Sequence, residues 1–480
     1  MENSGPNIDQ QAKELESLMA RVRDLRWQFG DETYDLYLES VYDASQKIVS
    51  AVVKKPGETR ALKLETKIDR VVTSKKWGFP IMFLLLAAVF WFTIVGTNYP
   101  SQWLSLLLVD TVHPWLKSMA ELTELPFWIS GLLIDGIYLT TAWVVSVMLP
   151  PMAIFFPMFT LLEDFGYLPR VAFNLDNVYR KVGAHGKQAL TMSMGFGCNV
   201  TGVIASRIID SPRERLIAII TNNFSLCNGR WPTQILIATI FIGSLAPSYL
   251  GGIVSAASVI AVALLGIFMS LLVSWGLHKT VLKGEASSFS LELPPYRPPR
   301  IKTILYTSLI DRTLVVLGRS VMFAIPAGMV IWLSVNISID GKSLAFYLTE
   351  WMDPVALFFG LNGIIFLAYI IAIPANEIVL PTILLLTVLG SSVSGQEGMT
   401  MISANSALET ADILKAGGWT LLTAVNLMLF SLLHNPCSTT IYTIYKETKS
   451  LKWTMYATFI PIVLGLVVTF LVARIWEIFG

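Results

Sequence analysis

The stretch WPTQILIATIFIGSLAPSYLGGIVSAASVIAVALLGIFMSLLVSWGL, residues 231–277, contains no Asp, Glu, Lys or Arg. A helix needs roughly 20 apolar residues to cross a lipid bilayer. With 47 residues, the stretch is long enough for two membrane-spanning helices. The Gly and Pro residues at 243–247 place the turn between them. The stretch therefore indicates an all-α membrane fold.

The composition of the whole chain agrees with this fold class. Of 480 residues, 54% are hydrophobic and only 14% are charged, whereas about a quarter are charged in a typical soluble domain. The formal net charge of +1 gives no reason to expect a nucleic-acid partner. Three cysteines, an odd number, lie in or beside apolar runs, which argues against a disulfide framework. The lipid bilayer is thus the expected partner of most of the chain.

Other apolar runs predict further spans. The first is expected at 79–97. The uncharged run 136–162 is broken by Pro150, Pro151 and Pro157. Five more runs have the composition of membrane helices: 315–335, 360–375, 378–391, 417–433 and 453–473. The chain is therefore predicted to be polytopic.

Lysine and arginine predict the sidedness. By the positive-inside rule, the acidic segments 98–126 and 337–353 are external. The same rule assigns five basic clusters to the cytoplasm: 75–76, 170–187, 207–215, 279–312 and 446–452. The N-terminus is therefore expected to be cytoplasmic. The Pro-rich sequence LPPYRPPR at 293–300 marks a cytoplasmic linker, 279–313, between two membrane halves, 77–278 and 314–480.

Residues 1–76 differ from the rest of the chain. Two stretches, 10–19 and 37–42, carry apolar residues at helical spacing among charged ones. They predict a short cytoplasmic region of amphipathic helices. The apolar faces of these helices must pack on one another or on another protein.

Each membrane half contains two polar interruptions within short apolar segments. They are GFGCNV at 195–200 and CNGRWP at 227–232, then IPANE at 373–377 and HNPCST at 434–439. Paired broken segments at corresponding positions are typical of transporters built from repeats. Broken backbone at membrane depth must face protein or a wet cavity. GFGCNV therefore fits a re-entrant turn, in which glycines allow positive φ and close approach, and the alternative is a contact of small residues between helices.

Each cysteine lies in one of these interruptions. Thiolates of Cys198, Cys227 and Cys437 would suit borderline and soft cations such as Fe(II), Zn(II) or Cu(I). Amide oxygens such as that of Asn199 suit harder cations. The alternative is that each cysteine packs as a small hydrophobic residue, and the sequence leaves both interpretations open.

Ionisable groups inside apolar runs are functional candidates. Glu377 is expected either to bind a cation or proton, or to pair with a buried cation such as Arg230. Arg230 itself is expected to cap carbonyls freed at Pro232. Asp135 is a weaker candidate, and His434 is either a ligand or an ordinary hydrogen-bonded histidine.

Nucleotide chemistry has no support in this sequence. There is no G-x-x-x-x-G-K-[ST] loop, because GAHGK at 183–187 has the wrong spacing. TKID at 66–69 imitates a guanine-reading element, but without a P-loop we interpret it as a helix end. The chain is therefore not expected to be an enzyme.

Several motifs together resemble a known family. They are LLEDFGYLPRVAF at 161–173, KVGAHGK at 181–187, GFGCNV, CNGRWP, NPC at 435–437 and KETKSLKW at 446–453. In this order, over about residues 65–476, the chain resembles the membrane domain of the ferrous iron transporter FeoB family.

The resemblance implies a bacterial inner-membrane permease with two Gate repeats of the nucleoside-recognition type. It implies that Cys198, Cys227 and Cys437 lie along the metal path with Glu377, and we add Asn199 to this metal-ligand set. Fe(II) is then the transported substrate, and no cofactor is permanently bound.

The resemblance also implies partners. The family carries an N-terminal G domain, whereas residues 1–75 resemble only the end of the helical domain that follows it. Either a separate GTPase works with the chain, or the sequence is a piece of a longer one. A small FeoA-like accessory protein is also implied, and homo-oligomerisation is left open.

Two residues depart from the family pattern. Thr201 stands where Pro usually follows GFGCNV, which predicts a looser turn. Asn376 stands where the family has Lys beside the acid. Mn(II) or Zn(II) is therefore an alternative substrate to Fe(II). A non-transporting Gate-repeat scaffold or assembly protein is the alternative from another class.

Overall fold

The computed structural model describes residues 17, 21, 37, 40–45, 47–49, 60–74, 76–247, 249–283, 296, 299–390 and 407–479. The chain divides into two compact units, Met1–Lys67 and Ile68–Gly480. In the first unit, residues 40–45 and 47–49 are helical and exposed. The helix expected at 10–19 lies almost wholly outside the described residues.

The second unit is built from helices, as the composition predicted. Among the described residues the strands are limited to a hairpin of β1 (Ser338–Ile339) and β2 (Lys342–Ser343). Asp340 and Gly341 form its turn with φ of 51° and 77°, a conformation that Asp-Gly adopts readily. The all-α polytopic fold class is confirmed.

The helices of the first half run from the start of α3 to the end of α13. Their bounds are α3 (Arg60–Val72), α4 (Gly78–Ser105), η1 (Leu106–Val112), α5 (His113–Leu122), α6 (Phe127–Ser130), η2 (Gly131–Tyr138), α7 (Leu139–Asp164), α8 (Tyr167–Lys181), α9 (Lys187–Gly197), α10 (Asn199–Ala205), η3 (Ser206–Ile208), α11 (Pro212–Thr221), η4 (Asn222–Phe224), α12 (Trp231–Ile237), η5 (Ala238–Ile242), η6 (Gly243–Leu245) and α13 (Gly251–Lys279).

The second half follows the linker. Its helices are α14 (Ile301–Tyr306), η7 (Thr307–Leu314), α15 (Val315–Asn336), α16 (Leu344–Phe358), α17 (Gly363–Ile371), η8 (Asn376–Ile378), α18 (Val379–Gly390), α19 (Ala407–Ala416), α20 (Leu421–Leu433), α21 (Ser438–Thr448) and α22 (Leu451–Phe479).

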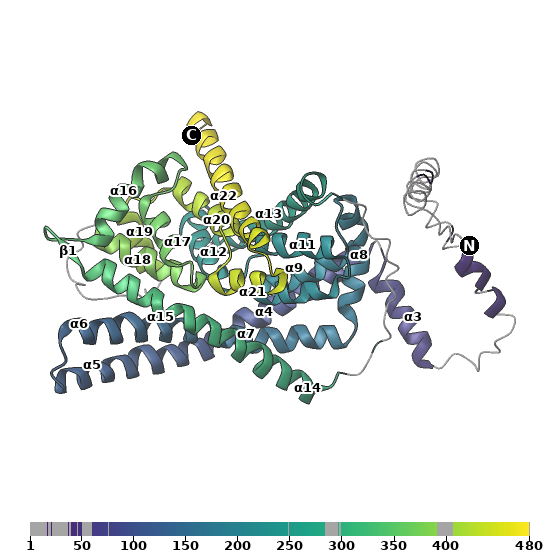
Figure 1. Ribbon diagram of the computed structural model, residues 1–480, viewed down its shortest axis with the longest axis horizontal. Coiled ribbons are helices and arrows are strands. Elements are labelled where there is room, and N and C mark those ends of the chain that lie inside the picture. Colours follow the sequence, from purple (N-terminus) through teal and green to yellow (C-terminus); the bar gives the residue numbers. More distant parts are fainter. Residues whose placement is uncertain are drawn as a thin grey trace, which may run out of the picture. The chain divides into compact units, whose positions relative to one another are not determined.

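Two long helical runs lie side by side in the first half (Figure 1). Gly78–Leu122 has 45 residues and Phe127–Asp164 has 38, so both are longer than the expected spans and than a bilayer needs. The second run also corrects the break expected at the prolines, because α7 continues through Pro150, Pro151 and Pro157. In lipid the backbone has no water to bond to, so the remaining intrahelical bonds hold the helix together.

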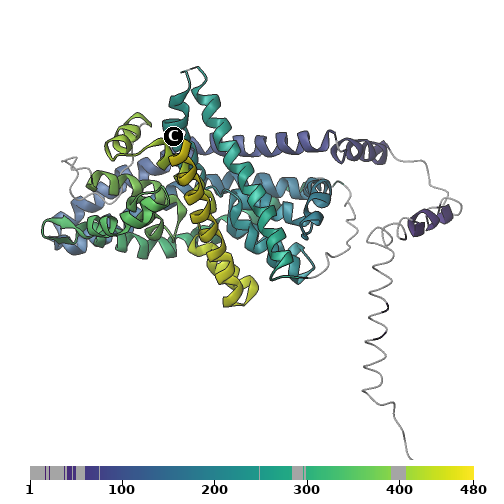
Figure 2. The ribbon, with the colours of Figure 1, turned by 90° about the horizontal axis from the view of Figure 1, so that it is seen from above.

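Broken helices occupy the core, and long helices flank them. Six described helical runs are long and apolar enough to cross a membrane, among them α13 and α22 (Figure 2). The run Trp231–Leu245 is shorter than a full span, and the spans expected at 360–375 and 378–391 are also fragments. The first of these belongs to a pair, α16 and α17, bent by 111°. Polar interruptions account for the shortening, because each ends a helix before it spans the bilayer.

A polar cluster ties α3, α8 and the linker together. Arg170, which is only 1% exposed, donates to Asp69 from Nε to Oδ1 at 2.9 Å and lies 3.9 Å from the ring centroid of Tyr296. The Tyr296 hydroxyl donates to the same Oδ1 at 2.8 Å. Burial by itself would raise the pKa of the Asp69 carboxyl, but the hydrogen bonds from Arg170 and Tyr296 lower it below its usual value. Asp69 is therefore an ionised anchor beside the first span.

Candidate functional site

GFGCNV forms a sharp break between two helices. Helix α9 ends at Gly197, Cys198 is extended with φ −155° and ψ 125°, and α10 begins at Asn199. The Thr201 N–H donates to the Cys198 carbonyl oxygen at 3.0 Å. Proline has no N–H, so threonine closes this turn with a bond that proline could not make.

The glycines around the break permit close packing. A Cβ on Gly197 would lie 1.9 Å from the Phe155 ring, and one on Gly202 would lie 2.2 Å from Asn222 Oδ1. Neither glycine has positive φ, and the same holds for Gly195. The expectation of close approach at these glycines is therefore confirmed, whereas the expectation of positive φ was wrong.

The second half contains a break of matching geometry. Ala375, immediately before η8, has φ −151° and ψ 119°, close to the values for Cys198. In each half, the backbone N–H of the residue that follows a cysteine donates to a carbonyl oxygen just before the break of that half. Asn228 N–H donates to the Gly197 carbonyl at 3.1 Å, and Ser438 N–H donates to the Ile373 carbonyl at 2.8 Å. This parallel supports the proposal that the two halves are repeats, with Cys227 and Cys437 in corresponding positions.

All five predicted site residues line one small cavity. They are Cys198, Asn199, Cys227, Glu377 and Cys437. The volume of this cavity is about 30 Å³, enough for a water molecule or a small cation. Other lining residues include Met148, Met152, Ser320, Asn376, Thr439 and Thr440. Residues from both halves thus meet at the breaks, while metal binding itself stays a prediction.

The thiols have polar neighbours in the cavity wall. Asn376 Nδ2 lies 3.8 Å from Cys227 Sγ, and Thr440 Oγ1 lies 3.2 Å from Cys437 Sγ. Within the part of the chain that the structure describes, no three His, Cys, Asp or Glu residues are grouped closely enough to hold a metal ion. The thiols and Glu377 therefore share a cavity without forming a complete ligand set.

Arg230 joins the two halves and is 3% exposed. Its guanidinium donates to the carbonyl oxygens of Leu432, His434 and Asn435 at 2.9, 3.1 and 2.9 Å, and to Asn223. Arg230 was expected to cap carbonyls near Pro232, and this expectation was wrong about the partners. Most of the carbonyls that it caps lie in the second half, at residues 432–435.

Glu377 packs against the backbone at Gly229. A Cβ on Gly229 would lie 2.5 Å from Glu377 Oε1, so only glycine leaves room for the carboxylate there. The ion pairs among the described residues do not include one between Glu377 and Arg230. The geometry therefore favours the cavity role of Glu377 over the buried ion pair.

The two weaker candidates lie away from the cavity wall. His434 packs between Tyr369 and Phe430, with ring centroids 4.5 and 5.2 Å away, and its Nδ1 lies 3.1 Å from the Asn435 carbonyl oxygen. Asp135 lies 2.7 Å from His113 Nε2 and 3.0 Å from Lys117 Nζ. Both are therefore explained by local partners.

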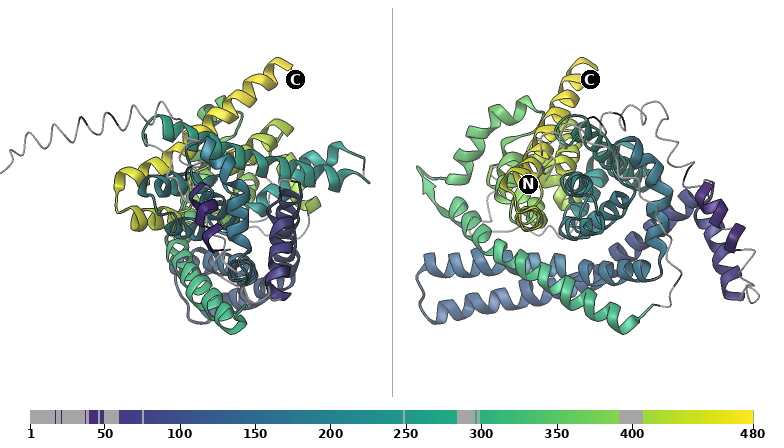
Figure 3. Two further views of the ribbon diagram at one scale, coloured as in Figure 1. Left: turned by 90° about the vertical axis from the view of Figure 1, so that its right-hand side faces the viewer. Right: turned by 45° about the vertical axis from the view of Figure 1, so that its right-hand side comes forward.

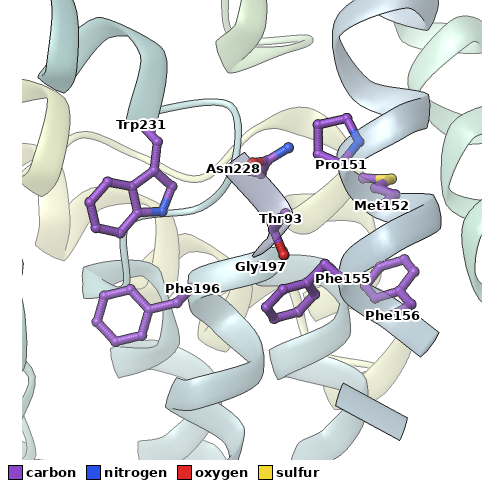
Figure 4. A pocket seen from close by; sticks show the side chains of 9 residues that line it. All are labelled: Thr93, Pro151, Met152, Phe155, Phe156, Phe196, Gly197, Asn228 and Trp231. Atoms are coloured by element: carbon purple, nitrogen blue, oxygen red, sulfur yellow. The ribbon is translucent and has the colours of Figure 1, made fainter. Parts of the chain in front are cut away.

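A second, smaller cavity adjoins the first and shares Met152, Gly197 and Asn228 with it. Figure 4 shows Phe155 and Phe156 on one side of this cavity and Phe196 and Trp231 on the other. Sequence reasoning missed these residues, and it also missed Thr439 and Thr440. The run of hydroxyl residues directly after Cys437 was the signal that could have identified the two threonines.

Comparisons with known proteins agree with this geometry. The Gate family, described as nucleoside recognition, matches residues 145–242, and the ferrous iron transport protein B C terminus matches residues 259–311. The chain is 31% identical over 444 residues to the Fe(2+) transporter FeoB of Staphylococcus aureus strain MSSA476, covering 90% of this chain and 62% of that protein. It is 25% identical over 480 residues to the Fe(2+) transporter FeoB of Methanocaldococcus jannaschii, covering 95% and 64%.

A third relative is a fusion from Porphyromonas gingivalis, named Fe(2+) transport protein A/Fe(2+) transporter FeoB fusion protein. The identity is 25% over 510 residues, covering 97% of this chain and 57% of the fusion. No solved structure matches the chain. The chain spans about three fifths of the length of these relatives.

Long apolar spans around paired broken helices define a multi-pass all-α membrane protein of the Gate type. Over most of its length the chain is similar to the Fe(2+) transporters FeoB, which confirms the resemblance seen in the motifs.

Proposed function

We propose that the chain is a permease for a divalent cation, with ferrous iron as its substrate, and not an enzyme. The observation that carries this proposal is the meeting of Cys198, Cys227 and Cys437 with Asn199 and Glu377 on one cavity. Thiolates with some oxygen donors suit a borderline cation such as Fe(II). The relatives named Fe(2+) transporters support the same substrate.

Access to the cavity would alternate between the two sides of a bacterial inner membrane, with the N-terminus in the cytoplasm. The cation enters from outside and is partly dehydrated by the five residues. Helices α10 and α21 both begin at the cavity and contact each other. Near their far ends, Arg207 donates to both carboxylate oxygens of Glu447, at 2.8 and 2.6 Å. Separating these ends would open the cavity toward the cytoplasm.

A GTPase is proposed to bias this equilibrium, acting through residues 1–76. It can do so only by binding one conformation better than the other. We propose that this GTPase is a separate chain. The Porphyromonas gingivalis fusion supports an accessory protein of the FeoA type as a second partner.

Metal flux into proteoliposomes tests the proposal. We expect the purified chain to move Fe(II), with smaller fluxes of Mn(II) and Zn(II), and a small G protein with GTP to raise the Fe(II) flux. Calcein-type quenching inside the vesicles reports each metal. Absence of flux for all three metals, with and without the G protein, would contradict the proposal and favour the scaffold alternative.

Gly229→Ala is expected to reduce this flux without loss of the folded protein. The added Cβ would displace the Glu377 carboxylate, which is the flexible end of a side chain, so the backbone can stay in place. Gly252→Ala in α13 is the matched control, because a Cβ at Gly252 meets nothing within 4 Å. Equal flux through the two variants would mean that Glu377 does not take part in transport.

A further inference from the structure

Two residues of the cavity wall each carry a buried oxygen atom that has no hydrogen-bond partner among the described residues. They are Asn199 Oδ1 and Thr439 Oγ1, on side chains that are 3% and 2% exposed. A buried polar group left without a hydrogen bond destabilises the folded state. Two such residues on one small cavity indicate that the cavity receives a group that bonds to them.

The orientation of Asn199 is fixed by its neighbours. Asn223 Nδ2 donates to the His434 carbonyl at 2.6 Å, so Asn223 turns its Oδ1 toward other donors. Asn199 Nδ2 is one of those donors, at 3.2 Å. Because the amide nitrogen of Asn199 is used in this way, the orphaned oxygen is the atom left to face a ligand.

Thr439 differs from the threonines that follow it. Thr440 Oγ1 contacts Cys437 Sγ at 3.2 Å, and Thr443 Oγ1 donates to the Thr439 carbonyl at 2.8 Å. Both hydroxyl groups therefore have protein partners, whereas that of Thr439 has none among the described residues. Thr439 is the second residue of α21, two positions after Cys437, and Asn199 is the first residue of α10, one position after Cys198.

We propose that Thr439 is a cation ligand, so that each half contributes one side-chain oxygen beside a thiol of the cavity: Asn199 beside Cys198, and Thr439 beside Cys437. This rests on the proposed function only in that the cavity receives a divalent cation. The described residues hold no group of three His, Cys, Asp or Glu placed for a metal, so donors of another kind would be needed to complete a ligand set. The two orphaned oxygens are such donors.

The mixed donor set predicts a difference between metals. Mn(II) and Fe(II) depend on oxygen ligands more than the softer Cd(II), for which the thiolates suffice. Removing the Thr439 hydroxyl should therefore weaken Mn(II) binding and leave Cd(II) binding nearly unchanged.

The test measures protection of thiols in the purified full chain. Cys198 and Cys437 are alkylated with an uncharged reagent at increasing Mn(II) or Cd(II), and their modification is read by peptide mass spectrometry. Thr439→Val, which replaces the hydroxyl with a methyl group, should raise the Mn(II) concentration for half-protection at least about tenfold, the lower end of what loss of a partner around a metal site costs. Thr439→Ser, which keeps a hydroxyl group, should return the Mn(II) concentration for half-protection to that of the unsubstituted chain. Thr443→Val, on the same helix and buried, is the matched control.

The outcomes separate the two proposals. Unchanged Mn(II) protection in Thr439→Val overturns the ligand assignment alone. Equal loss of Mn(II) and Cd(II) protection also overturns it, because Thr439 would then only hold the helix in place. Absence of protection by either metal in the unsubstituted chain overturns the cation site as a whole, and the proposed function with it.

Discussion

Replacing Cys198 by serine is expected to lower Fe(II) flux into proteoliposomes at least about tenfold, the scale of losses around metal sites. Cys198 is the extended residue between α9 and α10, and its thiol lines the cavity. Serine keeps the size and the backbone geometry but replaces a soft donor by a hard neutral one. The fold should survive, because the bonds that close this break are made by the Cys198 backbone.

The control for this variant lies four residues earlier, in the last turn of α9. Met194 is 5% exposed and is not part of the cavity wall, so Met194→Leu should leave the flux near that of the unsubstituted chain. Size-exclusion profiles and melting temperatures of both variants would show whether they fold. Flux through Cys198→Ser equal to that through Met194→Leu would mean that Cys198 only packs as a small hydrophobic residue.

The position of the candidate site could be read from the sequence because the site breaks local rules. GFGCNV and IPANE place Gly, Pro, amide and acid groups where lipid favours an unbroken apolar helix. Such groups are retained at membrane depth only where protein or a cavity receives them. This reasoning located both breaks and all five residues that now line one cavity.

Helix lengths were harder to infer, because local signals do not decide whether a proline ends a helix. Pro150, Pro151 and Pro157 all lie within α7, and the first helical run continues through Pro100 and Asp110 to Leu122. Figure 3 shows how these long helices lie beside the broken ones. Packing against neighbouring helices keeps such a helix continuous, and packing partners are not visible in a single sequence.

The role of Arg230 was inaccessible for the same reason. Its main acceptors lie about 200 positions further along the chain, at Leu432, His434 and Asn435. Sequence reasoning could recognise a costly buried cation, but it assigned the carbonyls nearest in the chain. Contacts between the two halves become known only when the halves are assembled.

Arg230→Met is therefore expected to lower the free energy of unfolding by about 3–5 kcal/mol, the range for removing one member of a buried charged network. The variant removes the Arg230 donor from three buried carbonyl oxygens, and although Asn223 still donates to that of His434, a lost hydrogen bond to a buried polar group is costly. Because those carbonyls precede Cys437, the interruption at 434–439 should loosen with respect to the interruption at 227–232, which contains Arg230. Reversible unfolding in mixed detergent micelles measures the change. Arg230→Lys keeps the charge but makes fewer of the hydrogen bonds, so its free energy of unfolding should lie between those of the unsubstituted chain and Arg230→Met.

Arg207→Met provides a control with the same change in chemistry at an exposed position. Arg207 also forms a two-bond pair, with Glu447, but its side chain is 61% exposed, and exposed pairs contribute about 0–1 kcal/mol. A large loss for Arg230→Met beside a small loss for Arg207→Met would establish Arg230 as the clamp between the halves. Similar losses for the two variants would mean that apolar packing alone holds the breaks together, with the guanidinium tolerated there and not required.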